Sequence, residues 1–269
     1  MEIINKHIMQ EYLALKIDYC RKQLEKLPVI KMQTYSKDNR PYEIFTVSGH
    51  RYRVKSKYGN RYLKIMQYRD TLERKLEYYE AVWNCKYKDI PFPDCESHKV
   101  IRTLCVDKDT KVTMDKAYFD SLKNDANTKY PKPMDYPFNG IYYRSAAERE
   151  IAIFYTENDI PFKYEPEVTI KGIPGFIYPD FVIYIPELDN CKFHEHFGMK
   201  DSARYLANTN TRYYNYTNAG LVPEIDIIFT HDVEEIPFDI RELSYKLNAV
   251  IGTTMISTKQ SLNNQRPAS

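Results

Sequence analysis

The sequence has few cysteines, little glycine and no long hydrophobic run. Its five cysteines are scattered over 269 residues, and an odd, dispersed number predicts reduced thiols and not a disulfide framework. No stretch approaches the roughly 20 apolar residues of a membrane-spanning helix, and residues 1–22 lack the apolar core of a signal peptide. We therefore expect a cytoplasmic protein with no membrane partner. The 8 Gly against 25 Tyr make tyrosine the unusual feature of the composition.

A strong net charge is also absent. The 39 Lys and Arg residues nearly balance the 37 Asp and Glu residues, which leaves a formal net charge of +2, so the overall charge does not indicate a nucleic-acid partner. The distribution is uneven, however, because residues 37–75 contain eleven Lys or Arg against four Asp or Glu. This local excess of seven positive charges indicates a basic surface in the amino-terminal part of the chain.

The chain is predicted to have an amino-terminal arm, a linker, a larger domain and a tail. Residues 1–85 show helical spacing at both ends and three short β-rich runs between them, which predicts a small α+β region with a β-meander. Residues 86–139 contain five prolines and one plausible helix, at 115–123, as is typical of a linker with local structure. Residues 140–257 are predicted to form an α/β domain, and residues 258–269 a disordered tail.

Within residues 140–257 the expected order of elements is α-β-β-β-α-β-α. Ser145 is a candidate helix cap, and the later segments alternate between β-rich and helical patterns. The predicted elements are a helix at 146–155, strands at 162–169, 176–185 and 192–197, a helix at 202–217, a strand at 225–230 and a helix at 240–250. This order is typical of an α/β domain.

Two acidic residues in neighbouring strands form the candidate chemical centre. Asp180 lies early in one predicted strand, and Glu195 lies near the end of the next, after a short turn. Antiparallel strands would bring the two carboxylates together, where they repel each other unless a divalent cation or a proton is shared. Oxygen ligands of this kind suit Mg²⁺ or Mn²⁺.

The pattern Pro179-Asp180 followed by Glu195 resembles the PD-(D/E)xK nuclease superfamily. Residues 143–250 contain further features in the expected order: Ser145-Ala-Ala-Glu148, residues 160–165, Glu195-His-Phe-Gly198, then Tyr205, Arg212, Tyr216, Gly220 and residues 227–230. More narrowly, the chain is similar to uncharacterised bacterial proteins that join such a domain to an amino-terminal helix, a β-meander and a second helix. The resemblance implies a restriction-endonuclease-like core and metal-dependent hydrolysis of phosphodiester bonds, in DNA more than in RNA. It also implies that Asp180, Glu195 and Glu148 bind Mg²⁺ or Mn²⁺.

One position departs from the superfamily pattern. A lysine is expected two residues after Glu195, where it would stabilise the transition state, and this position is Phe197. Arg212 or Lys200 on the following helix is a candidate replacement, and His196 is a third candidate if the strand bulges. An arginine supplies charge there, but it cannot act as a base at neutral pH.

Several of these residues also have purely structural interpretations. Ser145 and Glu148 have the spacing of a helix capping box. His194 and His196 alternate with Glu195, so a regular strand would point them to the other face of the sheet. Lys192 has the position of a solvated strand end.

The basic amino-terminal stretch is a candidate nucleic-acid surface. Arg51, Arg53 and Lys55 alternate along one strand, Lys57 and Arg61 continue the charge into the following helix, and three tyrosines are interleaved with them. Positive charge with stacking surfaces suits contacts with a nucleic-acid backbone and its bases. The alternative is an ordinary solvated face of a small sheet.

Three functional assignments therefore remain open from the sequence. The first is a Mg²⁺-dependent endonuclease. The second is a nuclease fold without catalysis that binds nucleic acid or protein, which Phe197 favours and the two retained carboxylates oppose. A metal-dependent enzyme acting on another phosphate ester is a third possibility.

Overall fold

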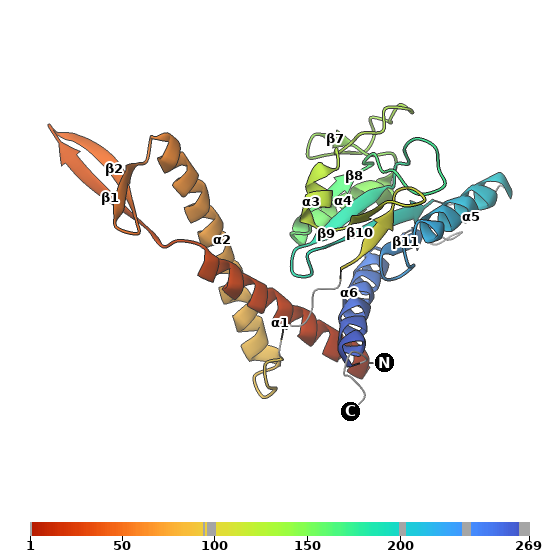
Figure 1. Ribbon diagram of the computed structural model, residues 1–269, viewed down its shortest axis with the longest axis horizontal. Coiled ribbons are helices and arrows are strands. Elements are labelled where there is room, and N and C mark those ends of the chain that lie inside the picture. Colours follow the sequence, from red (N-terminus) through yellow and green to blue (C-terminus); the bar gives the residue numbers. More distant parts are fainter. Residues whose placement is uncertain (1, 94, 96–100, 199–202, 233–237, 264–269) are drawn as a thin grey trace. The chain divides into compact units, whose positions relative to one another are not determined.

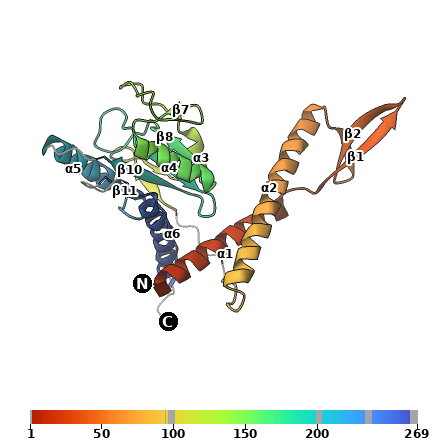
Figure 2. The same ribbon diagram turned by 180° about the vertical axis from the view of Figure 1, so that it is seen from behind.

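The chain forms two compact units in a mixed α/β structure with several small sheets (Figures 1 and 2). Unit 1 spans Met1–Cys95 and unit 2 spans Glu96–Ser269. The computed structural model describes residues 2–93, 95, 101–198, 203–232 and 238–263. Within these residues, no helix has both the length and the apolar character needed to cross a membrane. In the part of the chain that the structure describes, the five cysteines form no disulfide.

Unit 1 consists of two long helices and a three-stranded antiparallel sheet. Its elements are α1 (Glu2–Lys26), β1 (Ile30–Lys37), β2 (Arg40–Val47), β3 (His50–Arg53) and α2 (Lys57–Lys86). The strands follow the order β1-β2-β3, and α1 packs against α2. In both views the β1–β2 hairpin projects away from the two helices (Figures 1 and 2). The predicted helix–meander–helix arrangement is therefore confirmed within this unit.

A side-chain cap and a close backbone contact fix the start of α2. The helix begins before Gly59, because the side chain of Ser56 caps it by accepting a hydrogen bond from the Gly59 backbone N–H at 3.0 Å. A Cβ atom at Gly59 would lie 2.1 Å from the carbonyl oxygen of Arg53. Glycine at this position therefore allows β3 and the first turn of α2 to approach closely.

Unit 2 contains a mixed four-stranded sheet with helices on both faces. The strands are β8 (Phe162–Tyr164), β9 (Phe181–Ile185), β10 (Asn190–Phe197) and β11 (Ile227–His231), in the order β11-β10-β9-β8. β10 is parallel to β11 and antiparallel to β9, and β8 is antiparallel to β9. All residues of β9 and β10 are buried, so β10 is a central strand with no solvated side.

Three helices cover this sheet. They are α4 (Ala146–Glu157), α5 (Ala203–Asn218) and α6 (Ile240–Asn263). Tyr216 of α5 contacts Phe193 on one face, with ring centroids 6.1 Å apart, and Tyr155 of α4 contacts Phe181 on the other, at 5.7 Å. The chain order α4-β8-β9-β10-α5-β11-α6 matches the predicted order of elements.

Residues 101–126 belong to the core of unit 2 and do not form a linker. They contain β4 (Thr103–Cys105), β5 (Lys111–Thr113) and α3 (Lys116–Ser121). Leu104, Met114, Phe119 and Leu122 are buried in the same cluster as Val182 and Phe193 of the sheet. The short strands and the surrounding prolines concealed this contribution, because three-residue strands leave little periodicity in the sequence.

The remaining differences concern the ends of elements. β8 and β9 are shorter than predicted, and the segment between them is joined by an isolated bridge from Val168 to Ile177. Two further short strands, β6 (Pro137–Phe138) and β7 (Ile141–Tyr142), pair with each other. α6 continues to Asn263, beyond the predicted end at Val250 and into the predicted tail, and residues 264–269 lie outside the described residues.

Candidate functional site

Asp180 and Glu195 lie on the same face of the sheet, and Asp180 lines a pocket. Asp180 directly precedes β9, and its Oδ2 accepts a hydrogen bond from the backbone N–H of His196 at 2.7 Å. This bond continues the antiparallel pairing of β9 and β10 beyond its last backbone pair, Phe181 with His194. The predicted pairing of the two acidic residues across adjacent strands is therefore present.

The electrostatics of this pair indicate a site with excess negative charge. Burial raises the pKa of Asp180 well above its ordinary value, and the neighbouring carboxylates of Glu195 and Glu148 raise it further, against the opposing effect of Arg212. Glu195 is fully buried, and burial also raises its pKa. A positive charge from a ligand would relieve this repulsion.

Arg212 of α5 supplies a positive charge directly at the pair. Its Nη1 lies 2.6 Å from Oε2 of Glu195, while the hydroxyl of Tyr216, one turn later, donates to Oε1. The Arg212 side chain is 50% exposed, so the guanidinium spans from the buried carboxylate to solvent. Of the candidates for the missing lysine, Arg212 contacts Glu195, and Lys200 lies outside the described residues.

The imidazole of His196 points away from the carboxylates. Its Nδ1 lies 2.9 Å from Oγ1 of Thr230, its Nε2 lies 3.6 Å from Asp232, and its ring packs edge-on against Phe238. β10 continues without the bulge that would turn this ring, because its pairing with β11 is regular through Phe197. The prediction that His196 orients a water molecule at the pair is therefore not supported, and its contribution is the backbone N–H.

Phe197, at the position of the expected lysine, is a core residue. It is buried, and its ring stacks on Phe229 with centroids 5.6 Å apart and an interplanar angle of 16°. Tyr213 covers the same Phe229 ring at 5.2 Å. The space that a lysine side chain would occupy is filled by an aromatic cluster under α5.

Glu148 is held close to the pair by local hydrogen bonds. Ser145 caps α4 by accepting from the Glu148 backbone N–H at 3.1 Å, and Glu148 Oε2 accepts from the Tyr164 hydroxyl at 2.6 Å and from the Arg144 N–H at 3.1 Å. Burial raises the pKa of Glu148. The structural interpretation as a cap and the proximity to Asp180 are therefore both realised.

Glu165, which the sequence did not single out as a site residue, is a further buried carboxylate, and it lines the same pocket as Asp180. Its side chain is 5% exposed and lies 2.6 Å from Arg144 Nε and 3.1 Å from Lys132 Nζ. Asn127 donates to Glu165 Oε1 at 2.9 Å. The available signal was its place inside the predicted strand 162–169, immediately after Tyr164.

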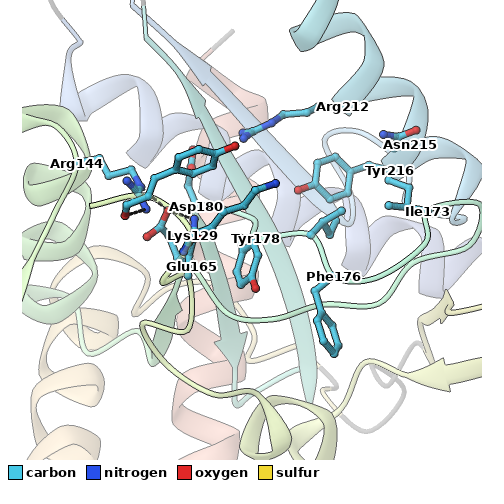
Figure 3. Close-up of a pocket in the computed structure, with 13 residues that line it drawn as sticks. Lys129, Arg144, Glu165, Ile173, Phe176, Tyr178, Asp180, Arg212, Asn215 and Tyr216 are labelled. Carbon is cyan, nitrogen blue, oxygen red and sulfur yellow. Dashed lines mark hydrogen bonds and ion pairs between the residues drawn. The ribbon is translucent and has the colours of Figure 1, made fainter. Parts of the chain in front are cut away.

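Asp180 and Arg212 are among the side chains that line a pocket of about 500 Å³ (Figure 3), whereas Glu195 and Glu148 are not. Asp180 contributes a carboxylate to the pocket, and the side chains of Lys129 and Arg212 point into it from different sides. Lys129 comes from the segment that was interpreted as linker, and within the described residues it forms no ion pair. The other lining residues are Asn127, Tyr130, Arg144, Glu165, Ile173, Phe176, Ile177, Tyr178, Asn215 and Tyr216.

Comparison of the chain with family models, with curated proteins and with solved structures gives no match. The chemistry of the pocket is consequently inferred from its own side chains.

The donor atoms at the pair suit a hard divalent cation, although they do not form a complete cage. In the described part of the chain, no group of three or more His, Cys, Asp or Glu side chains has a metal-binding arrangement. Asp180 and Glu195 offer carboxylate oxygens of the kind that such cations prefer. Burial is the main cause of the raised pKa of both groups, and at Asp180 the carboxylates of Glu195 and Glu148 raise it further. Both oxygens of Glu195 are engaged by Arg212 and Tyr216, so a cation bound to Glu195 would share it with them.

In unit 1, the predicted basic residues do not form one surface with the interleaved tyrosines. Arg51 and Arg53 are exposed on β3, Lys55 is exposed in the following turn, and Lys57 and Arg61 are exposed on α2. The tyrosines gather on the other side of β3, where Tyr52 packs against Tyr58 and Tyr62 with centroids 5.9 and 4.9 Å away.

Proposed function

We propose that this chain is a metal-dependent nuclease with a restriction-endonuclease-like core in residues 140–257. The observation that carries the proposal is the arrangement of Asp180, Glu195 and Arg212: two carboxylates on adjacent strands, a guanidinium 2.6 Å from Glu195, and a pocket lined by Asp180 and Arg212. The element order and the mixed sheet support the assignment of the core. DNA is the preferred substrate over RNA on the basis of the sequence resemblance.

The proposed cofactor is Mg²⁺ or Mn²⁺, held by Asp180 and Glu195 with Glu148 near them. Such a cation would lower the pKa of a bound water molecule and neutralise charge on a phosphate. The protein itself contributes the dry floor of the site, because Glu195 is fully buried, and it fixes Asp180 through the His196 N–H. A fixed and desolvated carboxylate pair is a preorganised receptor for positive charge.

Arg212 and Lys129 are proposed to bind the phosphodiester. Guanidinium groups bind phosphate oxygens through two parallel hydrogen bonds, and Arg212 reaches the pocket with half of its side chain exposed. Lys129 approaches from another wall and adds a second positive charge (Figure 3). Together they would hold the substrate against the carboxylate pair and stabilise charge that develops in the transition state.

The second candidate is a nuclease fold without catalysis, in which the pocket only binds nucleic acid or protein. Phe197 favours this candidate, because its stacking on Phe229 removes the usual catalytic lysine. The ion pair of Arg212 with Glu195 also favours it, since it already neutralises one of the two carboxylates.

A cleavage assay with charge-neutral variants distinguishes the two candidates. Single- and double-stranded DNA and RNA would be incubated with the protein in Mg²⁺, Mn²⁺ or EDTA. We expect metal-dependent cleavage by the wild type and loss of at least 100-fold in rate, roughly the effect of removing one catalytic electrostatic group, in Asp180→Asn and Glu195→Gln. Asp120→Asn, which changes an exposed carboxylate on α3, is the matched control and should remain active.

Binding measured in EDTA completes the test. Removing a negative charge at Asp180 should leave the affinity for nucleic acid unchanged or slightly increased, because repulsion of phosphate falls. If the wild type cleaves none of the substrates with either metal, and neither variant changes its metal binding, the catalytic proposal is wrong and the binding module is the better assignment.

A further inference from the structure

The sheet of unit 1 has one face that is basic and contains no acidic side chain. Strand register places Lys31 opposite Thr46 and Thr46 opposite Arg51, and it places Ile44 opposite Arg53. Because successive residues alternate between faces, one face consists of Lys31, Gln33, Tyr35, Lys37, Arg40, Tyr42, Ile44, Thr46, Arg51 and Arg53. Five of these ten residues are Lys or Arg, and all five are exposed.

The opposite face of the same sheet is the packed one. Phe45 and Val47 are buried, and Tyr52 lies against Tyr58 and Tyr62 of α2. Helix α2 packs on β2 and β3. The sheet is therefore amphipathic, and its basic face is the one turned away from these apolar contacts within unit 1.

Two tyrosine rings lie among the positive charges of the basic face. Tyr35 and Tyr42 are stacked, with centroids 5.8 Å apart and an interplanar angle of 24°. The guanidinium of Arg51 lies over the Tyr35 ring at 5.7 Å, and the Tyr35 hydroxyl donates to Gln33 Oε1 at 2.8 Å. Tyr42 is 37% exposed, so its ring is available to a ligand.

The charge of the whole unit favours a polyanion as the ligand. Residues 1–95 contain 19 Lys or Arg against 12 Asp or Glu, whereas residues 96–269 contain 20 against 25. Unit 1 thus carries an excess of seven positive charges, and unit 2 an excess of five negative charges. An extended row of cations with aromatic rings is the arrangement that tracks a phosphate backbone and stacks on bases.

We propose that the basic face of β1, β2 and β3 binds single-stranded nucleic acid, with Arg40, Arg51 and Arg53 on phosphates and Tyr42 stacked on a base. A single strand fits better than a duplex, because bases become accessible to aromatic rings only when they are unpaired. An anionic membrane fits less well, because membrane-surface elements combine basic residues with large apolar side chains, and Ile44 is the sole aliphatic residue of this face.

This surface differs from the one predicted from the sequence. Both surfaces include Arg51 and Arg53. In place of Lys55, Lys57 and Arg61, the basic face contains basic residues of β1 and β2. Its aromatic rings are Tyr35 and Tyr42, and not the tyrosines that lie between β3 and α2. The inference extends the proposed function by naming a second contact for its substrate, but binding at this face requires neither metal nor cleavage.

The test measures binding of the full chain in EDTA to a fluorescein-labelled DNA strand of about 20 nucleotides, which exceeds the ~4–16 nucleotides of a single small binding domain. Arg40→Ser/Arg51→Ser/Arg53→Ser should reduce affinity at least tenfold. The log–log salt slope should flatten by about 2, because each lost phosphate contact on a single strand contributes about 0.7. Lys57→Ser/Arg61→Ser/Lys64→Ser removes the same charge from exposed positions of α2 and should change affinity less than threefold, roughly the effect of charge alone.

A ring-specific variant tests the stacking. Tyr42→Leu should weaken binding of the single strand by about tenfold and leave binding of a duplex of the same sequence unchanged. Equal losses of affinity in the two triple variants would show that binding depends on overall charge and not on this face, which would contradict the inference. An unaltered affinity of the Arg40/Arg51/Arg53 variant would overturn it as well. Circular dichroism of each variant confirms that the sheet is intact. A wild type that binds in EDTA but never cleaves would retain this inference and refute only the nuclease activity.

Discussion

Glu195 is a fully buried carboxylate that depends on two side chains of α5 for compensation. Arg212 neutralises its charge, and Tyr216 donates a hydrogen bond to its second oxygen. Burying an ionised carboxylate without partners is strongly unfavourable. The site residues consequently also determine the stability of the fold. Effects on activity and effects on stability therefore have to be separated by paired substitutions.

Removing one partner should cost more than removing both. Arg212→Ala leaves the Glu195 charge buried with Tyr216 alone, and we expect the free energy of unfolding to fall by about 2 kcal/mol, typical of a lost hydrogen bond to a charged group. Adding Glu195→Gln to that variant should recover part of the loss, because no uncompensated charge remains. Urea unfolding of the two single variants and the double variant gives the coupling energy; strict additivity would mean that the ion pair does not contribute.

The activity of the Arg212 variants addresses its proposed role at the phosphate. Arg212→Ala should lower kcat without weakening metal binding, since the guanidinium is proposed to act on the substrate and on its transition state, and its removal leaves the Glu195 charge available to the cation. Arg212→Lys should restore the charge but only part of the rate, because it lacks the planar fork. Full activity of the alanine variant would remove Arg212 from the mechanism.

Asp180 should make the protein less stable as the pH rises. Its folded pKa is raised well above the ordinary 3.8, so the folded state binds more protons than the unfolded state above about pH 4, and its contribution to stability falls as the pH rises through the folded pKa. Asp180→Asn should therefore have a higher unfolding temperature than the wild type at pH 8. At pH 4 the unfolding temperatures of the two proteins should differ less.

The difference between the two proteins is the appropriate measure here, because the lowered pKa of His194, caused mainly by burial, acts in the opposite direction. Thermal unfolding in EDTA between pH 4 and 8 gives this difference. Adding Mg²⁺ at pH 8 should stabilise the wild type more than the variant. A variant that is less stable than the wild type at pH 8 would contradict the proposed repulsion.

At the scale of elements, strand β10 shows what could be read from the sequence and what could not. Alternation correctly placed Glu195 on one face and both His194 and His196 on the other. Lys192 was interpreted as a solvated strand end, but it is fully buried, and burial lowers its pKa to about 8. The error arose because β10 is central and covered on both faces, which no local pattern around Lys192 reveals.

The packing of β10 also predicts that a lysine cannot simply be introduced at position 197. Phe197→Lys would remove the ring stacked on Phe229 and place an amine in a buried aromatic cluster. We expect a loss of about 3–5 kcal/mol, as for truncation of a buried Phe, and no gain in cleavage. Phe197→Leu, which keeps an apolar side chain, should cost about 1 kcal/mol. Urea unfolding checks both values; a stable and more active lysine variant would show that the cluster can open.

At the scale of the whole molecule, the elements of residues 1–85 and 140–257 were predicted better from the sequence than those of residues 86–139, which lie between them. The arm of helix, meander and helix and the later α/β order follow from long periodic segments and turn residues. Residues 101–126 were misinterpreted because their buried side chains, such as Leu104 and Met114, come from three-residue strands and a loop. Lys129 and Glu165 were missed for a related reason, since only the folded chain brings them to the pocket of Asp180.

The two units should be separable, because each has its own buried side chains. Ile17, Phe45 and Leu72 are buried in unit 1, and the cluster around Val182 and Phe193 lies wholly in unit 2. A chain that begins at Glu96 should therefore unfold in one cooperative transition and retain metal-dependent cleavage at saturating substrate. Its affinity for single-stranded DNA should fall at least tenfold and lose most of its salt dependence, because unit 1 carries the basic face. Titration of both proteins with the same labelled strand at several salt concentrations, followed by single-turnover cleavage, measures each effect. Unchanged affinity would place the nucleic-acid contacts in unit 2, whereas loss of cleavage at saturation would show that unit 1 contributes to the catalytic step itself.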